Sequence, residues 1–208
     1  MELQLTLLFL SLLLGHASTL KCYKCKGIKC DEPDAVEVCA EGNMCMTRLD
    51  RQHFADKTIT KSCVSSEMCT NISLNLGSIT SEIHCCTGNL CNIAPDQQKA
   101  NKLLCLGCLE MLGDFKCNRS GSIPCEGSQT KCGSLEGFIE NGSRHFDFQG
   151  CVSESICSLN STKIIFGIDL QKRFQCCDGN LCNRSSRMET GSLGLIVLCL
   201  YLLISNNN

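Results

Sequence analysis

Apolar residues form one longer run at each end of the chain and many short runs between them. The longer runs extend from Leu5 to Leu14 and from Leu193 to Ile204. The short runs are bounded by Gly, Asn and Ser and have the length of strands rather than of helices. The pattern therefore predicts an all-β protein without an amphipathic helix between its two apolar ends.

Three segments carry the strongest strand and turn signals. Residues 57–60 and 163–167 are rich in β-branched side chains and are predicted strands. Residues 140–143 contain an Asn-Gly pair, which is a strong signal for a hairpin turn. All three segments favour the all-β interpretation.

The N-terminal apolar run is followed by small residues, among them Gly15, Ala17 and Ser18. This order is typical of a cleaved signal peptide, which we predict over residues 1–19 even though no positive charge precedes the run. About ten apolar residues are too few to cross about 30 Å of hydrocarbon. The chain is therefore predicted to enter the secretory pathway.

The C-terminal apolar run is also too short for an ordinary transmembrane helix. It follows a polar stretch, as in the signal for attachment of a glycosylphosphatidylinositol (GPI) anchor, whose tail is removed. We predict that residues 184–208 are this spacer and signal, with attachment at Ser185. Cys199 then leaves with the tail. The alternative is a secreted protein that keeps its apolar tail.

Twenty of the 21 cysteines form two copies of one pattern. Each copy opens with C-x-x-C, has five residues between its sixth and seventh cysteines, and closes with C-C-x-x-x-x-C-N. The first copy is Cys22, Cys25, Cys30, Cys39, Cys45, Cys63, Cys69, Cys85, Cys86 and Cys91, and the second is Cys105, Cys108, Cys117, Cys125, Cys132, Cys151, Cys157, Cys176, Cys177 and Cys182. The repeat predicts tandem domains over residues 20–93 and 104–183, joined by a polar linker over residues 94–103.

Ten cysteines in roughly 70 residues are typical of small secreted domains, whose thin cores need covalent cross-links. Zinc is an alternative partner for Cys22-x-x-Cys25 and its copy, but each would need a second pair at finger-like spacing, and secreted thiols oxidise. We therefore expect five disulfides in each domain, no metal and no cofactor. The residues alone leave about 945 ways to pair ten cysteines.

The sequence carries little that an enzyme would need. The histidines after the signal peptide, His53, His84 and His145, fall in different segments of the two domains. The chain has no G-x-S-x-G, H-E-x-x-H or phosphate-loop motif. A formal net charge of -2 gives no bias toward nucleic acid or anionic lipid. We predict a protein that is not an enzyme.

Five N-x-S/T sequons favour a glycosylated extracellular surface. They are centred on Asn71, Asn118, Asn141, Asn160 and Asn183.

The cysteine spacing and the C-C-x-x-x-x-C-N ending resemble the lymphocyte-antigen-6/urokinase-receptor superfamily, whose LU or three-finger fold is shared with snake neurotoxins. The resemblance covers nearly the whole mature chain, twice, and implies a small, disulfide-rich, all-β protein with two tandem LU domains. It also implies one pairing, which is Cys22–Cys45, Cys25–Cys30, Cys39–Cys63, Cys69–Cys85 and Cys86–Cys91, then Cys105–Cys132, Cys108–Cys117, Cys125–Cys151, Cys157–Cys176 and Cys177–Cys182. Asn92 and Asn183 resemble the family asparagine that hydrogen-bonds the cysteine knot.

The same resemblance places the second fingers at residues 46–62 and 133–150, and the third fingers at residues 70–84 and 158–175. Exposed apolar clusters often mark partner sites. The candidate partner contacts on the fingers of domain two are Phe138, Ile139, Phe146, Phe148, Ile165 and Phe166. The alternative is that half of these residues cover the sheet or the contact between the domains.

Residues 62–69 and 150–157 resemble gamma-type phospholipase A2 inhibitors, and urokinase-receptor-like surface proteins share much of this pattern. The C-terminal anchor signal favours the surface proteins. We expect a GPI-anchored glycoprotein at the extracellular face of the plasma membrane that binds an extracellular or cell-surface protein. A soluble secreted phospholipase A2 inhibitor is the alternative, and an architectural glycoprotein coat is a third candidate.

Overall fold

The computed structural model describes residues 19–27, 30, 35–52, 55–93, 98–111, 121–139, 144–167 and 170–184. Most of the predicted signal peptide, the C-terminal apolar run and Ser185 lie outside the described residues. Within the described part of the chain, no helix is long and apolar enough to cross a membrane.

Domain one consists mainly of strands in its described residues, with the short 3-10 segment η2 after β5. They are β1 (Lys21–Tyr23), β2 (Cys25–Gly27), β3 (Val36–Val38), β4 (Asn43–Gln52), β5 (Ala55–Ser65), η2 (Ser66–Met68), β6 (Ile72–Asn75) and β7 (Ile79–Cys86). β1 pairs with β3, while β6, β7, β4, β5 and β2 lie side by side in that order. The β4–β5 hairpin forms the second finger and the β6–β7 hairpin forms the third. The strand predicted at residues 57–60 is confirmed within β5.

Domain two contains β8 (Ala100–Met111), β9 (Gly121–Glu126), β10 (Lys131–Ile139), β11 (Arg144–Val152), α2 (Glu154–Cys157), α3 (Lys163–Phe166) and β12 (Gln175–Cys177). β10 and β11 pair antiparallel up to Ile139 and Arg144, so they flank the predicted turn at residues 140–143. β8 begins at Ala100, so its first four residues fall within the predicted linker of residues 94–103.

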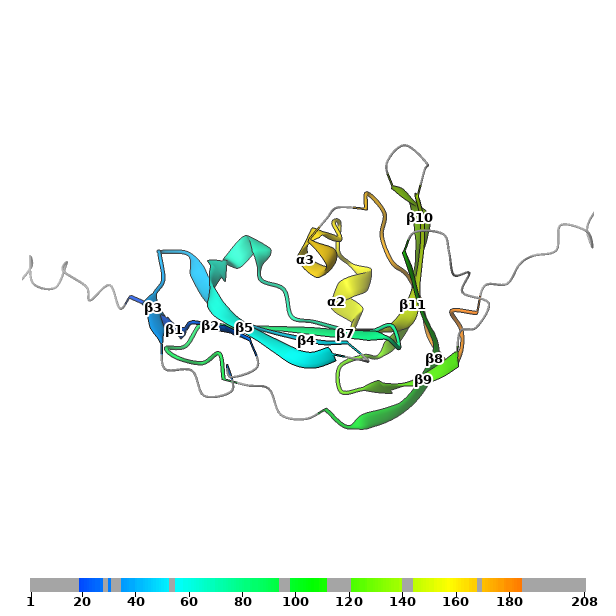
Figure 1. Cartoon of the computed structure of the whole chain (residues 1–208), viewed down its shortest axis with the longest axis horizontal. Helices are drawn as coiled ribbons and strands as arrows, with labels where there is room; N and C mark the ends of the chain where they lie inside the picture. Colours follow the sequence, from blue (N-terminus) through cyan, green and yellow to red (C-terminus); the bar gives the residue numbers. More distant parts are fainter. Residues whose placement is uncertain are drawn as a thin grey trace, which may run out of the picture.

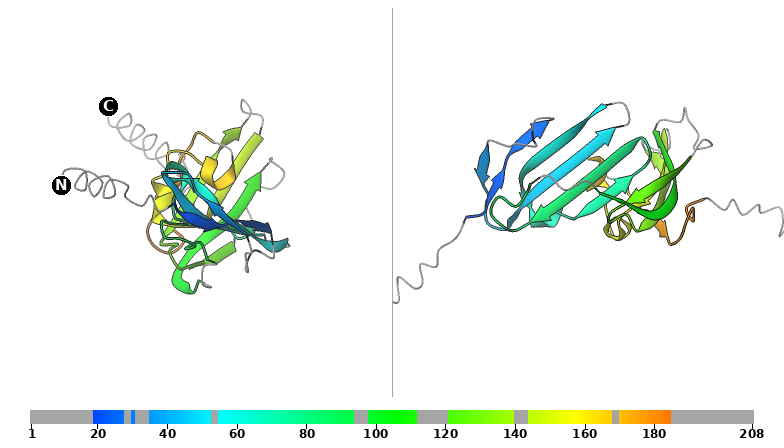
Figure 2. Two further views of the ribbon diagram at one scale, coloured as in Figure 1. Left: turned by 90° about the vertical axis from the view of Figure 1, so that its left-hand side faces the viewer. Right: turned by 90° about the horizontal axis from the view of Figure 1, so that it is seen from below.

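The two domains are joined by strand pairing. β11 pairs with β6, which places Cys151 opposite Asn75 and Val152 opposite Leu74. A Cβ atom on Gly150 would collide with the backbone carbonyl of Asn75, so glycine permits this close approach. The result is a ten-stranded sheet that runs from domain one into domain two (Figure 2).

The largest hydrophobic core is shared by the two domains. Domain one contributes Ile72, Leu74, Leu76 and Ile83, and domain two contributes Leu135, Phe146, Phe148, Val152, Ile156, Ile165, Leu170 and Phe174. Figure 1 shows α2 and α3 in the angle between the domain-one sheet and the β10–β11 hairpin. Burial of each large apolar side chain contributes about 1.5–3 kcal/mol, so this core couples the stability of the domains.

The prediction of a strand at residues 163–167 is wrong. Lys163–Phe166 form the one-turn helix α3, which ends at Gly167 with φ 76°. β-branched residues favour a strand locally. In this segment the helical turn directs Ile165 into the shared core, and the gain from its burial outweighs the local preference for a strand.

Candidate protein-binding surface

Nine disulfides join described cysteines, and each is a pair that the family resemblance implies. They are Cys22–Cys45, Cys25–Cys30, Cys39–Cys63, Cys69–Cys85, Cys86–Cys91, Cys105–Cys132, Cys125–Cys151, Cys157–Cys176 and Cys177–Cys182. Cys108 is also disulfide-bonded, while Cys117 lies outside the described residues. Three buried cysteines gather in each knot within 4.8 Å, but all belong to disulfides and offer no thiolate to a metal.

One asparagine closes each knot by the same three hydrogen bonds. In domain one, Asn92 accepts from the Tyr23 amide at 3.0 Å and donates to the carbonyls of Tyr23 and Met46 at 2.9 and 3.1 Å. In domain two, Asn183 accepts from the Leu106 amide at 3.0 Å and donates to the carbonyls of Leu106 and Gly133 at 2.9 and 3.2 Å. These contacts fit the structural role that the resemblance implies.

The geometry of Asn183 contradicts its prediction as a glycosylation site. The side chain is buried, and its Nδ2 atom donates both of its hydrogens to backbone carbonyls. A glycan would replace one of these hydrogens and would need a path to solvent. Asn71 and Asn160 are exposed and remain predicted sites, whereas Asn118 and Asn141 lie outside the described residues.

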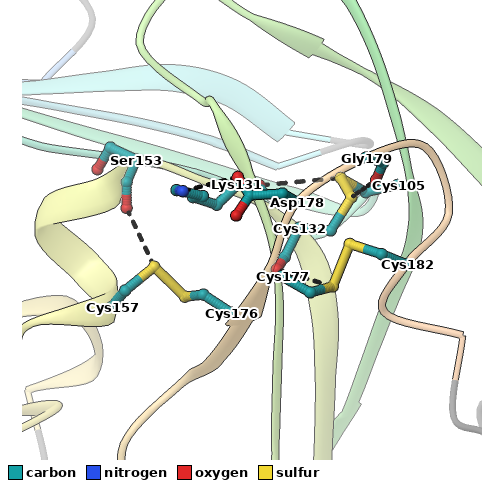
Figure 3. Close-up of polar contacts among 10 residues, drawn as sticks. All are labelled: Cys105, Lys131, Cys132, Ser153, Cys157, Cys176, Cys177, Asp178, Gly179 and Cys182. Carbon is teal, nitrogen blue, oxygen red and sulfur yellow. Dashed lines mark hydrogen bonds and ion pairs between the residues drawn. A yellow bond between two sulfur atoms is a disulfide. The ribbon is translucent and has the colours of Figure 1, made fainter.

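The closing loop of domain two is held by disulfides and one ion pair (Figure 3). Lys131 Nζ lies 2.7 Å from Asp178 Oδ1. The hydrogen bond to Asp178 raises the pKa of Lys131 despite partial desolvation, and the charges of Asp178 and Glu154 act in the same direction. Lys131 and Asp178 thus form an ion pair between β10 and the closing loop.

Three of the six predicted partner contacts are core residues, and their prediction as contacts is wrong. Phe146 and Phe148 have no exposed surface and Ile165 is 3% exposed. The Phe148 ring lies 5.4 Å from that of Phe146 and 4.7 Å from that of the half-buried Phe166, measured between centroids. These side chains cover the junction between the domains, which was the alternative that the sequence left open.

Phe138 is the predicted contact that the structure leaves at the surface. Its side chain is 64% exposed near the end of β10. Its ring meets that of His145 edge-on at a centroid distance of 5.1 Å, and Glu136 lies 3.2 Å from His145. Lys172 donates to the Glu136 carbonyl at 2.8 Å. Phe138 is therefore an apolar group held on a supported hairpin, while the Ile139 side chain lies outside the described residues.

Domain one carries exposed apolar residues that the sequence reasoning missed. Val36 is 50% exposed and Val38 is 61% exposed, and both lie on β3. Met68 and Ile93 are also exposed. The alternation Val36-Glu37-Val38 was the available signal, because alternate residues of a strand share a face.

The two histidines in the described part of the chain, His84 and His145, lie in different domains. On β7, His84 Nε2 lies 3.6 Å from Glu82 Oε2, whereas His145 contacts Glu136 in domain two. His53 lies outside the described residues.

Repeated knots, matched disulfides and finger hairpins define a protein with two tandem three-finger domains. Two family models match it, "Snake toxin and toxin-like protein" over residues 20–92 and "u-PAR/Ly-6 domain" over residues 101–185. The chain belongs to the u-PAR/Ly-6 (LU) three-finger superfamily, in the subgroup with two domains.

The chain is similar to two snake inhibitors and to a mammalian receptor. It is 28% identical to a gamma-type phospholipase A2 inhibitor of Gloydius brevicaudus siniticus over 70% of this chain and 76% of that protein. It is 28% identical to phospholipase A2 inhibitor NAI of Notechis ater over 70% of this chain and 80% of that protein. It is 27% identical to the urokinase plasminogen activator surface receptor of Rattus norvegicus over 62% of this chain and 41% of the receptor.

Proposed function

We propose that this protein is a GPI-anchored, N-glycosylated extracellular protein that binds a protein ligand through the fingers of domain two and catalyses no reaction. The observation that carries the proposal is Phe138, a large aromatic side chain exposed on a braced hairpin. Exposed aromatic residues of this kind anchor many protein interfaces. The relatives are named as inhibitors and a surface receptor, which supports a binding role.

Binding through Phe138 is tested with the mature protein purified from expressing cells, labelled with a fluorophore and titrated onto cultured cells. Phe138→Ala should weaken saturable binding about tenfold or more, as for a central interface aromatic. Secretion should be unchanged because the side chain is exposed. Met68→Ala, which removes an exposed side chain from domain one, is the matched control. Equal binding by Phe138→Ala and the unmodified protein would remove this surface from the proposal.

The predicted anchor at Ser185 has a separate test. Cells expressing the full chain are surface-labelled before and after treatment with phosphatidylinositol-specific phospholipase C. Release of the label into the medium is expected. Constitutive secretion without a labelled surface pool would contradict the anchor.

The second candidate function is a soluble phospholipase A2 inhibitor. It is favoured by the two inhibitor relatives, whose similarity to this chain extends over most of their length. The purified protein should leave the rate of a secreted phospholipase A2 unchanged if the surface-protein proposal holds. Saturable inhibition together with constitutive secretion would put the inhibitor first.

A further inference from the structure

The outer edge of β3 is open. Among the described strands β3 pairs with β1 alone, with Lys21 opposite Val38. The Lys21 amide and carbonyl bond to Asn89 Oδ1 and the Leu90 amide at 2.9 and 2.7 Å, so they point away from β3. Along an antiparallel pair, residues whose backbone groups point toward the partner strand alternate with residues whose groups point away from it. The amides and carbonyls of Val36 and Val38 therefore also point away from β1. They face outward, and no strand in the described part of the chain lies opposite them.

Domain two lacks one hydrogen-bond donor at the same edge. Pro124 on β9 is the counterpart of Val38, because each directly precedes the fourth cysteine of its knot. The register agrees, since Pro124 lies opposite Leu104 and Val38 lies opposite Lys21. The Leu104 amide and carbonyl again bond away from the partner strand, to Asn180 and Leu181. The outward position thus holds a proline, which has no N–H to offer to an added strand. Domain one has Val38 at the equivalent position, and valine keeps its N–H group.

We propose that the outer edge of β3 binds an extended segment of an extracellular protein as an added strand. The inference goes beyond the proposed function, since it adds a second protein-binding site, in domain one. Main-chain groups of Val36 and Val38 would supply the hydrogen bonds, and their side chains would select apolar residues at alternate positions of the segment. The exposed Lys21 lies on the same face, one strand inside the open edge, and its positive charge favours a carboxylate on the bound segment.

A second copy of this chain is a poorer occupant of the edge. Symmetric antiparallel pairing of two β3 strands about their centre would place Glu37 opposite Glu37, and like charges directly opposite are destabilising. Glu37 is already paired with Lys24 at 2.8 Å. The charges at the edge therefore fit an apolar and acidic segment of a different protein.

The test uses a phage-displayed library of random peptides selected on the purified mature protein. Selected peptides should share alternating apolar residues with an acidic residue. Their affinity should fall about tenfold for Val38→Pro, equivalent to about 1.4 kcal/mol, and stay nearly unchanged for Val38→Thr, which keeps the amide. Val38→Pro should be secreted normally, because Pro124 occupies the equivalent position in domain two.

Amide hydrogen exchange supplies a second readout. The Val36 and Val38 amides should exchange rapidly in the free protein and become protected when a selected peptide binds. The inference is overturned if no selected peptide discriminates Val38→Pro from Val38→Thr, or if the amides are already protected without peptide. Either result would leave phospholipase C release and the effect of Phe138→Ala intact, whereas loss of those two would overturn the proposed function itself.

Discussion

The two domains share one cysteine framework but differ in their third fingers. In domain one, the segment between Cys69 and Cys85 forms the β6–β7 hairpin. In domain two, the segment between Cys157 and Cys176 forms α3 and returns to the sheet only in the three residues of β12. Equivalent disulfides therefore fix where a finger begins and ends, but not the path between.

The difference shows that each third finger takes the conformation that its neighbour requires. β6 uses its free edge to pair with β11 of domain two. In domain two, α2 and α3 instead place Ile156 and Ile165 in the core that domain one helps to build. Arg48 of domain one donates to the Ile165 carbonyl at 2.9 Å, which ties α3 to the opposite domain.

The largest expected effect comes from emptying the shared core. Phe148→Ala should destabilise the protein by about 3–5 kcal/mol, the usual cost of truncating a buried phenylalanine. Thermal unfolding and secretion from expressing cells measure the loss. Phe138→Ala is the control, since its exposed ring should change stability little. Similar unfolding temperatures for the two variants would contradict a core that spans both domains.

A smaller loss is expected from separating β6 and β11. Gly150→Ala would push a methyl group into the Asn75 carbonyl, at a cost of about 3 kcal/mol. Limited proteolysis should then cut more rapidly between the domains. Gly121→Ala is the matched control, because an added Cβ there meets nothing within 4 Å. Unchanged proteolysis of Gly150→Ala would mean that the pairing does not hold the domains together.

The two asparagines test whether the knots are equivalent. Asn92→Ala and Asn183→Ala each remove three hydrogen bonds and should each cost about 2 kcal/mol in thermal unfolding. Asn183 also lies in a sequon, so glycopeptide mapping of the secreted protein should find it unmodified while Asn71 and Asn160 carry glycans. A glycan on Asn183 would contradict the burial of its side-chain amide.

The smallest expected effect is a pH-dependent change in stability that comes from Glu37. Domain two has the uncharged Ile123 at the equivalent position. Burial raises the pKa of Glu37, but hydrogen bonds from Lys24 and the Cys63 amide, with the charge of Lys24, lower it below 4.5 overall. Because its pKa is lowered in the folded protein, the ionised Glu37 side chain stabilises the fold at pH values above the ordinary pKa of 4.5. This stabilisation is lost as the pH falls through the lower pKa of the folded state.

Glu37→Gln should therefore unfold at a lower temperature than the unmodified protein at neutral pH. The difference should shrink as the pH falls below 4.5. The difference is measured by thermal unfolding of both proteins from neutral pH to below pH 4.5. Domain two should contribute no such pH dependence at this position, because Ile123 is uncharged. A difference that stays constant with pH would assign the effect of Glu37→Gln to packing.

Much of the fold follows from local pattern. The cysteine repeat specified two knots, and the family resemblance supplied the pairing found for the nine described disulfides. The strand at residues 57–60 follows from its β-branched residues. Among the candidate contacts, the exposure of Phe138 agrees with prediction, whereas Phe146, Phe148 and Ile165 are buried because domain one covers them. No local pattern reports which surface another domain will cover.

The sequence by itself determined the tandem arrangement, because the cysteine pattern repeats along the chain, and its resemblance to the LU family supplied the fold. The tertiary structure decided the helix at Lys163–Phe166, the shared core, the buried amide of Asn183 and the open edge of β3. Each of these depends on residues distant in sequence. Their contacts outweigh local propensity. Burial of one large apolar side chain contributes about 1.5–3 kcal/mol, whereas strand propensities span only about 1 kcal/mol.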